Sequence, residues 1–207
     1  MSINNIERRF FDQPSVEFRA VEDEGGKRFI EGYASVFETR SKLILESGKL
    51  FYETIERGAF DDVLKREDLD TKFVFNHDKN KILARTVSKT LLLTSDDRGL
   101  FFRAEIPQGV SYAEDVYALI KRGDLFSNSF AFSVDPKDVE WGKDESGART
   151  RTIKRVSGLY DVSVVVDAAY PDTTVAARHI KEIEESEVVK EEPKKYDTIP
   201  YQRDGIS

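Results

Sequence analysis

The sequence predicts a β-rich α+β fold, a barrel or sandwich of short strands with two or three helices packed on it. Short runs of β-branched and aromatic residues recur along the chain and are separated by turn-forming residues. Only two or three stretches have the spacing of an amphipathic helix. Hydrophobic residues make up 39% of the 207 positions, with 14 Phe and 8 Tyr among them, so we expect a domain with a hydrophobic core.

Eight segments have the composition of strands. In chain order they are 28–37, 72–75, 91–95, 100–106, 126–134, 139–141, 151–156 and 159–166. Segments 91–95 and 100–106 should form a hairpin, because residues 96–99 (DDRG) have good turn chemistry. Segments 139–141 and 151–156 should form a second hairpin around a polar turn. Gly32, inside the first strand, indicates a bulge or a close backbone approach.

Segment 126–134 alternates between two kinds of side chain. Apart from Asn128, one face carries large apolar residues: Phe126, Phe130, Phe132 and Val134. The other face carries only small residues: Ser127, Ser129, Ala131 and Ser133. We therefore expect the aromatic face to pack into the core and the small face to leave room for another group.

The clearest helix is predicted over 112–122. Its apolar residues form a stripe made of Tyr112, Val116, Leu119 and Ile120. Gly123 can close the helix, and Ser111 and Glu114 have the spacing of a capping box, which predicts Ser111 as the N-cap.

Two further helices are expected. A short one should follow 56–61, with Phe60, Val63 and Leu64 on one face. The last should run from a cap at Thr173 or Thr174 to about Glu185.

By composition the chain divides into an N-terminal extension (1–27), one domain (28–185) and a charged, flexible tail (186–207). The apolar residues of the tail are too scattered to offset an ordering cost of about 1–2 kcal/mol per residue. We therefore expect the tail to be disordered.

Charge and composition argue against several function classes. The formal net charge of −7 disfavours nucleic-acid binding, which needs a basic face. The absence of cysteine excludes a disulfide scaffold, a thiolate zinc site and a cysteine nucleophile. No apolar run approaches the roughly 20 residues of a membrane span, and residues 1–11 are polar rather than signal-like. We expect a protein that acts in a cytoplasm without a membrane or nucleic-acid partner.

Three residues could carry hydrolytic chemistry. Asp161 interrupts the β-branched run LYDVSVVV, and a buried carboxylate is costly unless it is paired. His77 follows an apolar strand, and Ser129 lies on the small face of 126–134. A serine, an imidazole that takes its proton and a carboxylate that orients the imidazole are the parts of a triad. Taken singly, a strand serine and a polar strand end are more often structural, so the residues alone leave both interpretations open.

Six sequence pieces resemble the caudovirus prohead serine protease family, in the order in which that family has them. They are EGYASVF (31–37), ERGAF (56–60), FNHD (75–78), DDRGLFFRAEIP (96–107), RGDLFSNSFAF (122–132) and LYDVSVVVDAAYPDT (159–173). The resemblance covers roughly residues 29–178. It implies an assemblin-like β-barrel surrounded by a few helices, with 28–185 as the protease domain.

The resemblance also implies the roles of the candidate residues: Ser129 as the nucleophile, His77 as its base and Asp161 as the third member. Assemblins use a second histidine there, which leaves His179 as an alternative. No cofactor is implied, and the sequence has no metal-ligand cluster.

The implied activity is a serine endopeptidase that cleaves scaffold and capsid proteins, and itself, during phage procapsid maturation. Its partners would be the major capsid protein or its scaffolding segment, with self-association, inside the assembling procapsid in the host cytoplasm. The alternative is a non-catalytic capsid-interior scaffolding protein on the same fold.

Overall fold

The computed structural model describes residues 6–11 and 18–166. The chain divides into two units, Met1–Tyr170 and Pro171–Ser207, and every described residue belongs to the first. The expected last helix, His179 and the expected tail at 186–207 lie outside the described residues. Among residues 6–11 and 18–166, no helix is both long and apolar enough to cross a membrane.

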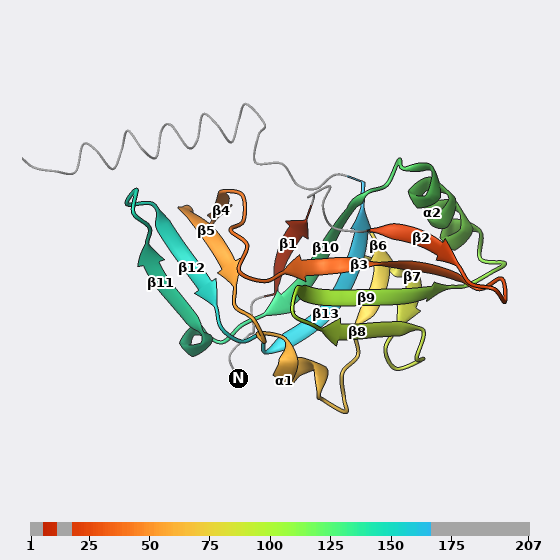
Figure 1. The fold of residues 1–207 in the computed structure, drawn as a ribbon, viewed down its shortest axis with the longest axis horizontal. Helices are drawn as coiled ribbons and strands as arrows, with labels where there is room; N and C mark the ends of the chain where they lie inside the picture. The colour runs from red at the N-terminus through yellow and green to blue at the C-terminus, as the bar shows by residue number, and fades with distance from the viewer. Residues whose placement is uncertain (1–5, 12–17, 167–207) are drawn as a thin grey trace, which may run out of the picture. The chain divides into compact units, whose positions relative to one another are not determined.

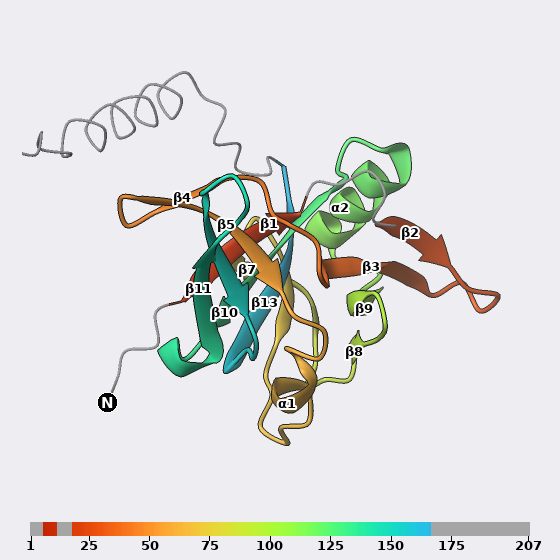
Figure 2. The ribbon, with the colours of Figure 1, turned by 60° about the vertical axis from the view of Figure 1, so that its left-hand side comes forward.

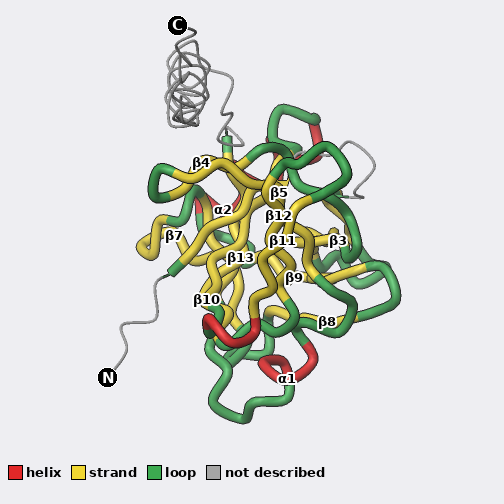
Figure 3. The backbone as a smooth tube through the Cα atoms, turned by 90° about the vertical axis from the view of Figure 1, so that its left-hand side faces the viewer, coloured by secondary structure: helices red, strands yellow, loops and turns green. Residues whose placement is uncertain are grey.

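The described chain is built mainly of strands (Figure 3). The strands are β1 (Glu7–Phe11), β2 (Arg19–Glu22), β3 (Arg28–Val36), β4 (Ile44–Glu46), β5 (Lys49–Ile55), β6 (Lys72–Phe75), β7 (Asp78–Arg85), β8 (Leu91–Ser95), β9 (Gly99–Ile106), β10 (Ser127–Ser133), β11 (Val139–Lys143), β12 (Arg149–Ile153) and β13 (Gly158–Val165). The helical elements are α1 (Asp61–Leu64), α2 (Ser111–Arg122) and a 3₁₀ turn, Pro136–Asp138. The prediction of a β-rich fold with few helices is confirmed.

The strands form three sheets (Figure 1). Their strand orders are β1-β10-β13-β6-β7, β11-β12-β5-β4 and β2-β3-β9-β8. Within the described residues these orders do not close into a ring, so the barrel that the resemblance implies stays a prediction.

Both predicted hairpins are confirmed, as β8 with β9 and β11 with β12. A bulge falls between Tyr33 and Ser35 of β3, next to the Gly32 that indicated one. The close backbone approach is at Gly99, where a Cβ would lie 2.0 Å from the carbonyl oxygen of Ser35. Only glycine can occupy this end of the β8–β9 hairpin without moving the backbone.

The capping box predicted for α2 is wrong. The helix begins at Ser111 itself, its N-cap is Val110, and no side chain caps it. Since Ser111 is already inside the first turn, its hydroxyl is one residue too late to act as the cap. Glu114 instead accepts a hydrogen bond from the backbone N–H of Gly109 at 3.0 Å. The other end is as predicted, because Gly123 is left-handed (φ 91°) and donates to the last carbonyls.

Strand β10 is buried on both faces. Phe130 and Phe132 enter the core, as their alternation predicted, and stack on each other at 4.9 Å between ring centroids. Phe126 does not join them: it lies outside the strand and is 62% exposed. The small face is also covered, since Ser129 is fully buried.

Two strands come from the expected N-terminal extension. β1 pairs antiparallel with β10, and β2 pairs with β3. We did not predict these strands from the sequence, nor β4, β5 and β7. In β1, β2 and β7 the charged residues hide the alternation of a strand. The limits of the protease domain therefore remain a proposal.

Strand β1 is fixed by a buried ion-pair cluster that joins it to β5 and β12. Arg9 bonds Glu53 at 2.6 Å and Glu7 at 2.6 Å. Arg151 bonds Glu7 at 2.5 Å and Glu53 at 2.8 Å. Burial alone would raise the pKa of Glu7, but the hydrogen bond from Arg151 and the charges of Arg9 and Arg151 outweigh it and lower the pKa. The cluster thereby holds the edge strand next to β10 in place.

The lowered pKa of Glu7 predicts an acid-sensitive contribution to stability. The ordinary pKa of a glutamate carboxyl is 4.5, and the folded protein lowers the pKa of Glu7 below it. At pH values above 4.5 the ionised carboxylate therefore stabilises the fold, and this contribution is lost as the pH falls through the folded-state pKa. At pH 7, Glu7→Gln should cost about 3 kcal/mol, because it leaves Glu53 as the only buried carboxylate that bonds Arg9 and Arg151 in the described residues. The difference from wild type should shrink as urea unfolding is repeated toward pH 3.

The matched control is Glu46→Gln, since Glu46 contacts Arg9 at 3.2 Å but its side chain is 35% exposed. Its loss should stay within about 1 kcal/mol at every pH. Equal unfolding midpoints for Glu7→Gln and wild type at pH 7 would contradict the assignment.

Candidate active site

The three candidate residues come from neighbouring parts of the five-stranded sheet. Ser129 lies in the middle of β10, Asp161 lies on β13, and His77 lies in the turn between β6 and β7. β13 runs between β10 and β6, antiparallel to the first and parallel to the second. β10 and β13 can be seen side by side in Figure 2. The sheet order therefore brings Asp161 close to His77, which is 84 positions earlier in the chain, and to Ser129, which is 32 positions earlier.

His77 occupies a strained two-residue turn. Phe75 pairs with Asp78, so Asn76 and His77 are the whole connection between β6 and β7. Their φ angles are 52° and 55°, as the common two-residue hairpin turn requires. Left-handed backbone costs a non-glycine residue roughly 1–2 kcal/mol, so the turn must be held by its surroundings.

The imidazole of His77 bridges the other two side chains. Its Nδ1 lies 2.7 Å from Asp161 Oδ1, and its Nε2 lies 2.8 Å from Ser129 Oγ. A carboxylate only accepts hydrogen bonds, so the proton of the neutral ring is on Nδ1. The lone pair of Nε2 then faces the hydroxyl of Ser129. This arrangement can take the proton of a serine that attacks a carbonyl.

Little water reaches these groups. Ser129 is fully buried, Asp161 is 7% exposed, and the side chain of His77 is 12% exposed. The ring of Phe10, on β1, meets the His77 ring edge to face at 6.2 Å between centroids. Because few competing water contacts remain, the hydrogen bonds around the imidazole are strengthened.

Two residues that the sequence did not single out complete the surroundings of His77. Ser163 accepts a hydrogen bond from the backbone N–H of His77 at 2.9 Å. Phe10 contributes the ring contact. Ser163 is two positions after Asp161 in LYDVSVVV, so the alternation of a strand puts both side chains on one face, and that signal could have placed Ser163 near His77. Nothing local in residues 6–11 points to His77.

Ser133, another serine of β10, has different surroundings. Ser133 Oγ lies 3.0 Å from Ser157 Oγ and 3.0 Å from the hydroxyl of Tyr160. In the part of the chain that the structure describes, Ser129 is the serine whose hydroxyl meets His77 Nε2.

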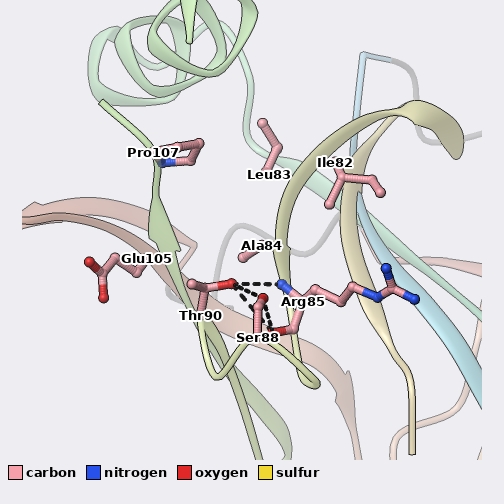
Figure 4. A pocket seen from close by; sticks show the side chains of 8 residues that line it. All are labelled: Ile82, Leu83, Ala84, Arg85, Ser88, Thr90, Glu105 and Pro107. Atoms are coloured by element: carbon pink, nitrogen blue, oxygen red, sulfur yellow. Dashed lines mark hydrogen bonds between the residues drawn. The ribbon is translucent and has the colours of Figure 1, made fainter. Parts of the chain in front are cut away.

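A separate cavity of about 490 Å³ lies at the far end of β7 from His77. It is lined by Ile82, Leu83, Ala84, Arg85, Ser88, Thr90, Glu105 and Pro107 (Figure 4). Thr90 Oγ1 accepts a hydrogen bond from the backbone N–H of Arg85 at 2.9 Å at its rim. None of the three candidate residues lines this cavity.

The chain is similar to one known protein family and to individual known proteins. The family described as caudovirus prohead serine protease matches residues 14–186, a range that contains His77, Ser129 and Asp161. The prohead protease of Enterobacteria phage HK97 is 28% identical over 184 residues, which are 87% of this chain and 71% of that protein. The structure of the bacteriophage T4 capsid assembly protease aligns with 76% of this chain and 96% of its own, at 12% identity and a TM-score of 0.42.

The Asp161 contact predicts the tautomer of His77. In the wild type the neutral ring should carry its proton on Nδ1. Asp161→Asn should reverse this, because the amide can donate to Nδ1 and leave the proton on Nε2. Imidazole ¹⁵N shifts distinguish the two tautomers, and the chain has only two histidines to assign.

Asp78→Asn is the matched control. Asp78 is adjacent to His77, but its Oδ1 accepts from the backbone N–H of Asn80 at 2.9 Å. The tautomer should be unchanged in this variant. A wild-type ring protonated on Nε2 would contradict the geometry.

Proposed function

The chain belongs to the caudovirus prohead serine protease family, and on this premise we propose that Ser129 is its nucleophile, His77 its general base and Asp161 the third member of the triad. The protein is a serine protease with a role in phage capsid maturation. The observation that carries the assignment is the imidazole of His77, with Ser129 Oγ at 2.8 Å and Asp161 Oδ1 at 2.7 Å.

The proposed reaction is acyl transfer to Ser129. Its Oγ attacks the scissile carbonyl carbon while its proton passes to His77 Nε2. When the carbon–nitrogen bond breaks, the same proton goes to the leaving amine and the acyl group stays on Oγ. Water then attacks the acyl carbon while its proton passes to Nε2. The bond between that carbon and Ser129 Oγ breaks, Oγ takes the proton back from Nε2, and the new carboxyl end of the peptide leaves. Asp161 accepts the Nδ1–H throughout and stabilises the imidazolium.

We propose scaffold and capsid proteins as substrates: the scaffolding segment of the major capsid protein, and the protease itself. The relative from phage HK97 is named for the prohead, which supports action inside the assembling procapsid in the host cytoplasm. We also propose self-association, 28–185 as the protease domain with an assemblin-like barrel, and the segment 186–207 as an arm that can be removed.

The triad assignment predicts the effect of Ser129→Ala. The variant should stay folded and lose cleavage of the co-expressed major capsid protein, by roughly 10³-fold or more. His77→Ala should be as damaging, and the double variant little worse, because triad members act as a unit. Mass spectrometry of the capsid protein gives the cleavage sites and their extent.

Ser127→Ala is the matched control, since Ser127 is a buried serine two residues away on the same face of β10. Ser127→Ala should still cleave the capsid protein. In a separate experiment, EDTA should leave the activity of the wild type unchanged. Cleavage by Ser129→Ala at the wild-type rate would refute the assignment. A scaffolding protein without enzymatic activity would show no cleavage in any variant.

A further inference from the structure

We propose that Ser163 is a positioning residue of this triad: its hydroxyl holds the backbone of His77 so that the imidazole reaches Ser129. The inference rests on the proposed function, because it assigns Ser163 a role in the chemistry of His77 and Ser129. It goes beyond the triad itself, since Ser163 would act through His77 and not on the substrate.

The turn that carries His77 needs an external support. Both of its residues have left-handed backbone, and neither is glycine. Three hydrogen bonds tie the turn to the end of β13: Asn76 N–H donates to the Val164 carbonyl at 2.8 Å, Val166 N–H donates to Asn76 Oδ1 at 3.0 Å, and His77 N–H donates to Ser163 Oγ at 2.9 Å. Only the last of these three fixes His77 itself.

The hydroxyl of Ser163 is oriented for this task. Ser163 is fully buried. Its proton is directed at backbone carbonyls, with Val164 O at 3.1 Å and Val74 O at 3.3 Å. A lone pair of the same oxygen therefore faces the N–H of His77. With its proton committed to a carbonyl and its lone pair to an amide, Ser163 is suited to support the base and not to act as a second nucleophile.

Ser163 and Asp161 are two positions apart on β13, so both side chains project from the same face. One strand thus holds His77 twice, at the ring through Asp161 and at the backbone through Ser163. Ser163 also stands directly opposite Ser129 in the β10–β13 register. The same short piece of β13 therefore positions both the base, His77, and the strand that carries the nucleophile, Ser129.

A serine at position 163 breaks a run of valines. Valine or alanine there would pack in a buried strand but offer no acceptor to the His77 N–H. A buried N–H without an acceptor costs about 1–3 kcal/mol, and the strained turn would relax to avoid it. The ring would move with the backbone, away from Ser129 Oγ.

The test is Ser163→Ala, assayed with a peptide that spans a capsid cleavage site. A displacement of the base of about 1 Å costs roughly 10²-fold in rate, so kcat should fall by about 10- to 100-fold while KM stays unchanged. Ser163→Thr keeps the hydroxyl acceptor and should recover most of the lost kcat.

Ser133→Ala is the matched control. Ser133 is also fully buried on the same sheet, and its hydroxyl bonds Ser157 and Tyr160 instead of His77. We expect Ser133→Ala to lower the urea unfolding midpoint about as much as Ser163→Ala does, and to leave kcat unchanged. This separates a loss of stability from a loss of positioning.

A second readout needs no substrate. Hydrogen exchange at the backbone amide of His77 should be slow in the wild type and at least about tenfold faster in Ser163→Ala, because each 1.4 kcal/mol of lost protection is a factor of ten. Exchange of the same amide should be unchanged in Ser133→Ala.

The outcomes distinguish the two proposals. Wild-type kcat and unchanged His77 amide exchange in Ser163→Ala, with Ser129→Ala inactive, would overturn the positioning role and leave the triad standing. Full cleavage by Ser129→Ala would overturn the triad. In that case the amide exchange would still decide whether Ser163 holds the turn.

Discussion

The hydrogen bond between Asp161 and His77 is the interaction on which the geometry of the site depends. A carboxylate that is 7% exposed is costly unless a partner compensates its lost hydration, and the Nδ1–H of His77 is that partner. The same bond fixes which ring nitrogen faces Ser129. The stability requirement of β13 and the chemical requirement of the base are therefore met by a single contact.

Burial of Ser129 constrains how a substrate can reach the site. A peptide carbonyl must approach its hydroxyl, yet the side chain is fully covered. Strand β1 lies directly beside it, with Phe10 opposite Ser129 in the register and against His77. β1 is the edge strand of its sheet, and its hold on β5 and β12 is mainly ionic. Strand β1 and Phe10 are therefore part of the immediate surroundings of the nucleophile and its base.

The sequence was most informative where a pattern is local. The β-branched run of β13 marked a buried strand, and Asp161 stood out in it as a carboxylate in need of a partner. The alternation in β10 placed Phe130 and Phe132 in the core. These inferences need only a strand's period of two and the cost of burying charge.

The rest depends on contacts between distant segments, which no local pattern reveals. Residues 7–11 (ERRFF) look like a polar terminus because the partners of their charges, Glu53 and Arg151, are far along the chain. The role of Ser163 depends on the left-handed turn at His77, and the hydrogen-bonded support appears only once β6 and β13 lie side by side. The predicted capping box at Ser111 was wrong although it is a local pattern. The S-x-x-E spacing cannot tell whether the serine precedes the helix or is its first residue, and here it is the first residue.

The central claim is that His77 activates Ser129. The most direct test is covalent labelling by a small fluorophosphonate, in a preparation that cleaves its co-expressed capsid protein, with the adduct located by peptide mass spectrometry. The account predicts an adduct on Ser129 that is absent from His77→Ala. An adduct on another serine, or equally fast labelling of Ser129 in His77→Ala, would contradict it.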